Sequence, residues 1–105
     1  MKKIAIFASG TGSNAQKIID HFRRSVYGII HLIVCNNPGA GVLKIAAVEN
    51  IEVLLIEKDT FNTTGYVSEL KNCGIEFIVL AGFLWKVPGI LIESYPGKII
   101  NIHPA

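Results

Sequence analysis

Short apolar segments alternate with segments of helical period along the whole chain, and this alternation most restricts what the chain can fold into. Most of the apolar segments are β-branched and apolar on both faces, which is typical of parallel strands buried between two layers of helices. We predict strands at residues 3–8, 29–35, 52–56, 76–80 and 98–101. The alternation therefore predicts an α/β fold with a doubly wound parallel sheet and right-handed crossovers.

Helices are predicted between these strands. Apolar residues recur at helical spacing along one face of the first helix, namely Ala15, Ile18, Ile19, Phe22 and Val26. Ser13, with Gln16 three residues later, matches a capping box, which predicts that this helix starts directly after Ser13. Two further helices are expected within residues 41–51 and 64–74, and a shorter one within 87–97.

The composition indicates one compact domain and excludes several kinds of partner. The 105 residues are 50% hydrophobic and 17% charged, and a chain of this length buries roughly two-thirds of its unfolded surface. A net charge of +2 is too small to indicate a nucleic-acid or membrane partner, and no apolar run is long enough to span a bilayer. Cys35 and Cys73 stand in no recognisable spacing, so we expect two buried, reduced thiols in a cytoplasmic protein.

The last predicted strand raises a question about the domain boundary. KIINI, residues 98–102, is apolar on both faces, as an interior strand is, yet the sequence stops at residue 105. We therefore expect residues 1–105 to be the N-terminal part of a single longer domain, truncated after the fifth strand, unless another chain covers the edge.

The segment ASGTGSN, residues 8–14, lies where the first strand turns into the first helix. Ligands of open parallel sheets bind beyond the carboxyl ends of the strands, and glycines followed by free helix N–H groups suit an anion. We interpret this turn as a phosphate-binding loop; a tight turn without a ligand is the alternative. The second strand ends without a carboxylate to hold a ribose, and the loop lacks a P-loop lysine, so a phosphate monoester is favoured over NAD or ATP.

Asn101 and His103 follow in the last strand and just beyond it. They are two residues apart, so in an extended chain both side chains leave on the same face. An amide donor can stabilise an oxyanion, and an imidazole can move a proton as an amine attacks a carbonyl. The pair is a candidate for acyl transfer; in the alternative interpretation, both side chains only satisfy backbone groups in a proline-bounded turn.

Three segments, FASGTGSN, VLAGFLWKVP and IINIHPA, resemble the phosphoribosylglycinamide formyltransferase family of purine biosynthesis. The resemblance implies a Rossmann-like formyltransferase fold and transfer of a formyl group from 10-formyltetrahydrofolate to the amine of 5-phosphoribosylglycinamide, without a metal. It also implies that the partners are these small molecules, with no nucleic acid and no membrane, and it leaves the oligomeric state open.

The resemblance assigns roles by position. The backbone of Gly12, Ser13 and Asn14 would hold the substrate phosphate. Asn101 would stabilise the oxyanion and contact the cofactor, and His103 would be the general acid/base. The pterin pocket would be lined, largely through main-chain atoms, by Leu84, Trp85, Lys86 and Val87.

The chain also departs from the family pattern. The family usually has an arginine where Trp85 stands and another near the third helix, where KDTFNTTGYVSEL has none. Phe83 is expected to pack inward. The family continues past NIHP with an aspartate that orients the histidine, so the 105 residues alone are expected to be inactive. Alternatives are methionyl-tRNA formyltransferase, formyltetrahydrofolate hydrolase, or a non-catalytic phosphate-binding module.

Overall fold

A single parallel sheet organises the computed structural model of this protein, which describes residues 1–102. The strand order is β3-β2-β1-β4-β5, and every neighbouring pair is parallel. The strands are β1 (Lys2–Ala8), β2 (Gly28–Cys35), β3 (Glu52–Leu55), β4 (Ile75–Ala81) and β5 (Ile99–Ile102). All five predicted strands are confirmed, and no strand end differs from its predicted position by more than one residue.

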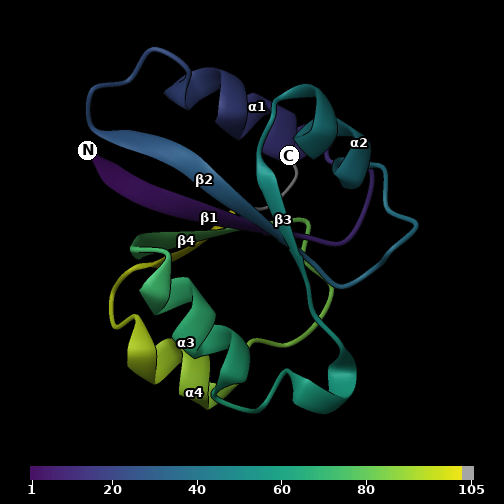
Figure 1. The fold of residues 1–105 in the computed structure, drawn as a ribbon, viewed down its shortest axis with the longest axis vertical. Helices are drawn as coiled ribbons and strands as arrows, with labels where there is room; N and C mark the ends of the chain where they lie inside the picture. Colours follow the sequence, from purple (N-terminus) through teal and green to yellow (C-terminus); the bar gives the residue numbers. More distant parts are fainter. Residues whose placement is uncertain (103–105) are drawn as a thin grey trace.

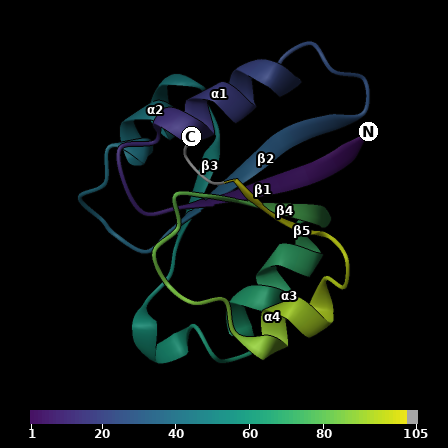
Figure 2. The same ribbon diagram turned by 180° about the vertical axis from the view of Figure 1, so that it is seen from behind.

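Helices cover both faces of the sheet. Figures 1 and 2 show α1 and α2 on one face and α3 and α4 on the other, so the doubly wound prediction is confirmed. The helices are α1 (Ser13–Phe22), α2 (Val42–Val48), α3 (Gly65–Asn72) and α4 (Gly89–Ser94), with a short 3-10 helix, η1, at Lys58–Thr60. The chain runs outward from β1 through β2 to β3 and then returns to β4, which places the reversal of strand order between β1 and β4.

The core consists of two layers that share the central strand. Ala5 and Phe7 of β1 pack toward α3 and α4, whereas Ile4, Ile6 and Ala8 pack toward α1 and α2. Because β1 is enclosed on both faces, both sets of its side chains must be apolar. This explains why the strand does not show the alternation of a half-exposed strand.

The start of α1 differs from the prediction. Gly12 is the residue that precedes the helix, and no side chain caps it, so the predicted capping box is wrong. The Gln16 amide instead donates to Asp20 Oδ1 and to Glu49 Oε2, both at 3.0 Å. Val26, which was expected on the buried face, lies beyond the end of α1 and is 73% exposed.

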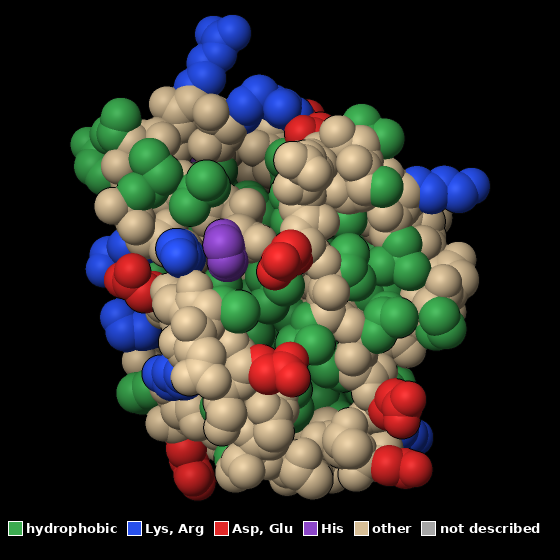
Figure 3. All heavy atoms as spheres, in the orientation of Figure 1, with side chains coloured by type: hydrophobic (Ala, Val, Ile, Leu, Met, Phe, Trp, Pro, Cys, Tyr) green, Lys and Arg blue, Asp and Glu red, His purple; other side chains and the backbone are tan. Residues whose placement is uncertain are grey.

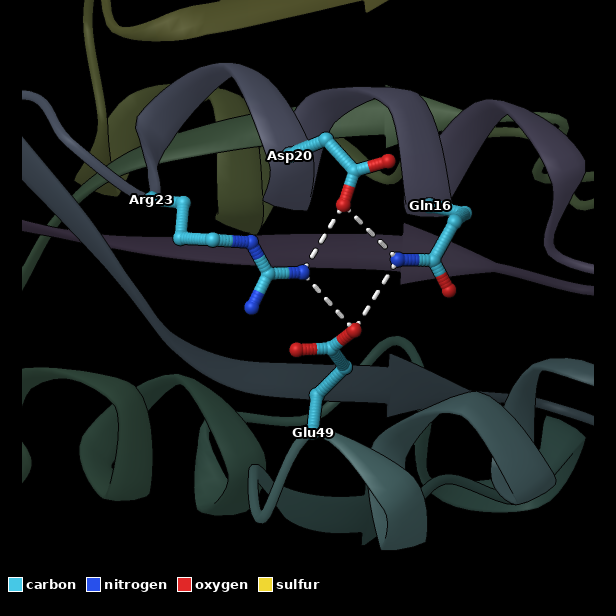
Figure 4. A network of polar contacts seen from close by, with 4 residues as sticks. All are labelled: Gln16, Asp20, Arg23 and Glu49. Carbon is cyan, nitrogen blue, oxygen red and sulfur yellow. Dashed lines mark hydrogen bonds and ion pairs between the residues drawn. The ribbon is translucent and has the colours of Figure 1, made fainter.

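A polar network joins α1 to the end of α2 (Figure 4). Arg23 Nη2 lies 2.8 Å from Asp20 Oδ1 and 2.9 Å from Glu49 Oε2. Hydrogen bonds from Arg23, and then from Gln16, lower the pKa of both carboxyls below their ordinary values. The network therefore favours the ionised carboxylates and fixes the two helices against each other.

β5 is an edge strand with an open apolar side. Ile99 packs against the core layer that contains α3 and α4, while Ile100 and Ile102 are 52% and 37% exposed. Ile100 and Ile102 line a shallow groove on the α1 face together with Asn14, Ile18, Phe22 and Val79. Both cysteines are free; Cys35 is buried as predicted, but Cys73 is only partly buried.

Replacing Arg23 tests the network through the pH dependence of stability. A lowered carboxyl pKa stabilises the fold above the unfolded value of about 4, and this contribution is lost as pH falls through the folded pKa. Arg23→Gln is therefore expected to lower Tm slightly at pH 7, and this effect is expected to shrink as the pH falls below about 4 and both carboxyls become protonated. Arg24→Gln is the control, because Arg24 is exposed and forms no ion pair within residues 1–102. A difference that persists unchanged at pH 3 would contradict the assignment.

Candidate ligand-binding site

The carboxyl ends of the strands form one rim of the molecule. Phe7 of β1 pairs with Leu80 of β4, and Leu80 pairs with Asn101 of β5. The loop after β1, the loop after β4 and the end of β5 therefore leave the sheet on the same side. The first two flank the reversal of strand order, where doubly wound folds bind their ligands.

The loop after β1 requires glycine at position 12. Gly12 has φ 86°, a left-handed conformation that side chains with a Cβ disfavour. A Cβ at this position would also lie 2.7 Å from Ile45 Cδ1 and 2.9 Å from the Val42 Cα. The Val42 amide donates to the Gly10 carbonyl at 3.1 Å, so the loop is tied to the start of α2.

The first turn of α1 presents main-chain donors at this rim. The first helical hydrogen bond runs from the Gln16 amide to the Gly12 carbonyl at 2.8 Å. The preceding amides of Ser13 and Asn14 belong to the turn in which helix N–H groups have no intrahelical acceptor. Gly12 is buried, whereas Ser13 is exposed and Asn14 is partly exposed. The accessible donors for an anion are therefore those of Ser13 and Asn14.

Ser9 connects this loop to the loop after β4. Its side chain is buried, and its Oγ accepts a hydrogen bond of 2.9 Å from the Leu84 amide. Ser9 belongs to the ASGTGSN segment but was not among the predicted site residues. Because of this bond, the predicted phosphate loop and the predicted pterin segment are directly joined.

An open groove of about 600 Å³ follows along the loop after β4. It is lined by Lys58, Phe61, Asn62, Leu84, Trp85, Lys86, Val87, Pro88 and Gly89. The aromatic side forms a continuous cluster: the ring centroids of Phe61 and Trp85 are 5.5 Å apart, and those of Phe61 and Phe83 are 5.6 Å apart. Phe83 also packs edge-on against buried Phe7, so its predicted inward position is confirmed.

Sequence reasoning missed the part of this groove that comes from the segment after β3. Lys58, Phe61 and Asn62 line the groove but were not predicted, because the segment lacks the arginine that the family usually has there. A usable signal was present: Phe61 is an isolated aromatic residue in the polar stretch KDTFNTTG. Its ring stacks on Tyr66 at 5.2 Å, and burial raises the pKa of the Tyr66 phenol to about 12.

Asn101 lies at the same rim but does not line the groove. Asn101 is exposed and alternates along β5 with Ile100 and Ile102. Asn14 lines the shallow groove that also contains Ile102, which brings the start of α1 beside the end of β5. His103 lies outside the described residues.

Residues 1–102 offer neither a cluster of metal ligands nor a membrane-spanning helix. No three His, Cys, Asp or Glu side chains in this range gather as possible metal ligands. The same range contains no helix that is long and apolar enough to cross a membrane.

The fold and the rim define a Rossmann-like α/β domain with a glycine-rich loop and an adjacent apolar groove. A family model described as formyl transferase matches residues 2–105. The chain therefore belongs to the formyl transferase family.

Similar proteins agree with this assignment. Phosphoribosylglycinamide formyltransferase of Bacillus subtilis is 33% identical over 111 residues, covering 100% of this chain and 57% of the relative. The chloroplastic enzyme of Arabidopsis thaliana is 37% identical, covering 99% of this chain and 38% of the relative. The crystal structure of glycinamide ribonucleotide transformylase 1 from Geobacillus kaustophilus has a TM-score of 0.89 at 37% identity, covering 99% of this chain and 58% of that one. The chain thus spans well under two-thirds of the length of these proteins.

Gly12→Ala tests whether the loop needs glycine. We expect it to reduce the free energy of unfolding by about 1–2 kcal/mol from the left-handed backbone alone, with a further cost from the contact with Ile45. Gly10→Ala is the matched control, because a Cβ there meets nothing within 4 Å, and it is expected to change stability by less than about 0.5 kcal/mol. Urea unfolding measures both, and equal effects would refute the requirement at position 12.

Proposed function

We propose that this chain carries the phosphate loop and part of the folate site of a phosphoribosylglycinamide formyltransferase. The reaction transfers a formyl group from 10-formyltetrahydrofolate to the amine of 5-phosphoribosylglycinamide. The hydrogen bond from the Leu84 amide to Ser9 supports this most directly, because it joins an anion-binding turn to an apolar groove at one rim. Relatives of that name, 33% and 37% identical, support the same reaction.

The residues at the rim have properties that suit these ligands. The amides of Ser13 and Asn14, with the backbone of Gly12, would hold the phosphate at the positive end of the α1 dipole. The groove has the size of a small-molecule site and an aromatic side that suits a flat heterocycle. Leu84, Trp85, Lys86 and Val87 would line the pterin pocket, as the sequence resemblance implies.

Asn101 and His103 would carry the chemistry. The amine of the ribonucleotide attacks the formyl carbon, and negative charge develops on the formyl oxygen. The amide of Asn101 would donate a hydrogen bond to this oxygen and contact the folate. The imidazole of His103 would take up the proton that the amine releases and return it to the folate nitrogen as the bond between that nitrogen and the formyl carbon breaks, so that tetrahydrofolate leaves. The strand register supports the placement of Asn101, because it puts this residue level with Leu80 at the carboxyl rim.

The charge distribution and the thiols support small-molecule partners and a cytoplasmic location. On the face shown in Figure 3, Lys and Arg side chains are spread around the margin and interleaved with Asp and Glu. Nucleic-acid-binding domains instead gather basic residues into a patch or stripe. Cys35 and Cys73 are both free, as expected for a reducing compartment.

Titration with the two ligand types separately tests the proposal. Ribose 5-phosphate is expected to shift the amide NMR signals of Ser13 and Asn14, and folic acid to quench the emission of Trp85, the only tryptophan. Ser13→Ala keeps phosphate binding because the contact is through the backbone, while Ser9→Ala weakens folic acid binding because Leu84 loses its acceptor. Binding of ribose 5-phosphate alone would favour a non-catalytic module, and binding of neither would refute the proposal.

The 105 residues are expected to show no formyl transfer when assayed alone. The family resemblance places the aspartate that orients the histidine beyond the NIHP segment, and an imidazole without such a partner has no fixed tautomer. Release of tetrahydrofolate from 10-formyltetrahydrofolate in the presence of the ribonucleotide measures the activity. Turnover at a rate usual for an enzyme would show that residues 1–105 contain every essential group.

A further inference from the structure

Exposed apolar side chains gather at the amino ends of β1 and β2, which is the end of the sheet opposite the candidate site. Met1, Val26, Tyr27 and Ile29 are 71%, 73%, 81% and 46% exposed, and we call them the amino-end patch. Figure 3 shows hydrophobic side chains grouped over the N-terminus and the start of β2. Grouped apolar side chains on a surface indicate an interaction site.

Tyr27 projects from this patch on a fixed backbone. Its amide donates to Ser25 Oγ at 3.0 Å, and its carbonyl accepts a hydrogen bond of 3.0 Å from the Lys2 amide. A ring that is 81% exposed contributes little to the fold itself. Tyrosine loses little conformational freedom when it is buried and is one of the side chains that most often anchor interfaces, so Tyr27 is suited to insertion into a partner.

An open pocket of about 320 Å³ lies beside Tyr27, between the ends of α1 and α2 and the start of β2. Ser25 and Gly28, on either side of Tyr27 in the sequence, line this pocket, whereas Tyr27 is not among the lining residues. An apolar cavity of about 150 Å³ holds a benzene molecule, so this pocket has room for a phenol ring. Much of its wall is apolar, from Met1, Ile19, Phe22, Ile29 and Ile51.

The charge of the pocket favours an uncharged occupant. Within residues 1–102, the only ionisable side chains that line it are Arg23 and Glu49, and these neutralise each other at 2.9 Å (Figure 4). The hydroxyl of Ser25 is already bonded to the Tyr27 amide. No ionised side chain of the wall therefore requires a charged partner, and an aromatic side chain matches the pocket better than an anion or a cation does.

We propose that the amino-end patch is the interface of a symmetric dimer of this chain, in which Tyr27 of each protomer inserts into the pocket of the other. In a two-fold interface the same surface occurs on both subunits, so a projecting ring and a pocket on one surface complement each other twice. A different protein would have to supply both shapes, whereas a second copy already has them. The candidate ligand site lies at the other end of the strands and stays open, so this proposal is independent of the proposed function.

Sedimentation equilibrium at chain concentrations from about 10 to 500 μM tests the dimer, since small interfaces are weak. A reversible monomer–dimer equilibrium is expected. Tyr27→Ala removes both anchors and is expected to raise the dimer Kd at least about thirtyfold, because an anchoring side chain contributes about 2 kcal/mol or more. Tyr27→Phe keeps the ring and is expected to keep the dimer. Circular dichroism of dilute samples verifies that each variant is folded.

A mixing experiment tests whether ring and pocket act together. Ile29→Lys places a charge at the pocket and is also expected to abolish the dimer. A mixture of Tyr27→Ala and Ile29→Lys chains retains one intact ring and one intact pocket, so it is expected to associate more strongly than either variant alone. Failure of the mixture to do so would overturn the proposed contact.

Ile100→Lys separates this dimer from pairing through the free edge of β5. Ile100 is 52% exposed on β5, outside the pocket, so this variant is expected to dimerise like the unchanged chain. Loss of the dimer in Ile100→Lys would assign the association to the β5 edge and refute the proposal. A chain that stays monomeric at every concentration, or a dimer that survives Tyr27→Ala, would refute it as well.

Discussion

The burial of β1 on both faces is the constraint on which the rest of the structure depends. Ile6 and Phe7 are fully buried on opposite sides of one strand, so one helical layer must cover each side. Each layer can then be supplied only by crossovers that leave the carboxyl end of one parallel strand and return to the amino end of the next. The same constraint gathers the loops that follow β1 and β4 at the reversal of strand order. The position of the candidate site thus follows from the way the helices cover both faces of β1.

Polar contacts then give that rim its particular shape. Ser9 is the only polar residue within residues 1–102 that is as buried as the core, and its single bond to the Leu84 amide sets the path of the loop after β4. Gly12 fixes the loop after β1 by fitting where no Cβ can fit. Leaving a buried polar group without its partner costs about 1–3 kcal/mol, which is large against the net stability of a domain. Both loops are therefore held by contacts within the protein itself, without the need for a bound ligand.

The sequence was sufficient to predict the strands and the layer arrangement, because apolar runs with two buried faces, such as 29–35, are typical of interior parallel strands. It failed at the start of α1, where Gln16 fits a local capping pattern but bonds to Glu49, 33 residues away. It also missed Lys58 and Phe61, because their contribution to the groove depends on a contact between loops after different strands. The phosphate-loop and pterin roles remain predictions from the family resemblance, whereas the connection of the two segments through Ser9 is a tertiary contact that no local pattern reveals.

The two edge strands of the sheet, β3 and β5, have a practical consequence. Both edge strands expose aliphatic side chains that are more than a third accessible, namely Val53 and Leu55 of β3 and Ile100 and Ile102 of β5. Each edge therefore combines unpaired main-chain groups with exposed apolar side chains. Exposed edge strands of this kind can pair with the edge strands of further copies of the chain. β3 and β5 carry few of the charged or proline residues that usually prevent such pairing. The isolated chain is therefore expected to aggregate as its concentration or the ionic strength rises. Dilute solutions at low salt are expected to keep it monomeric.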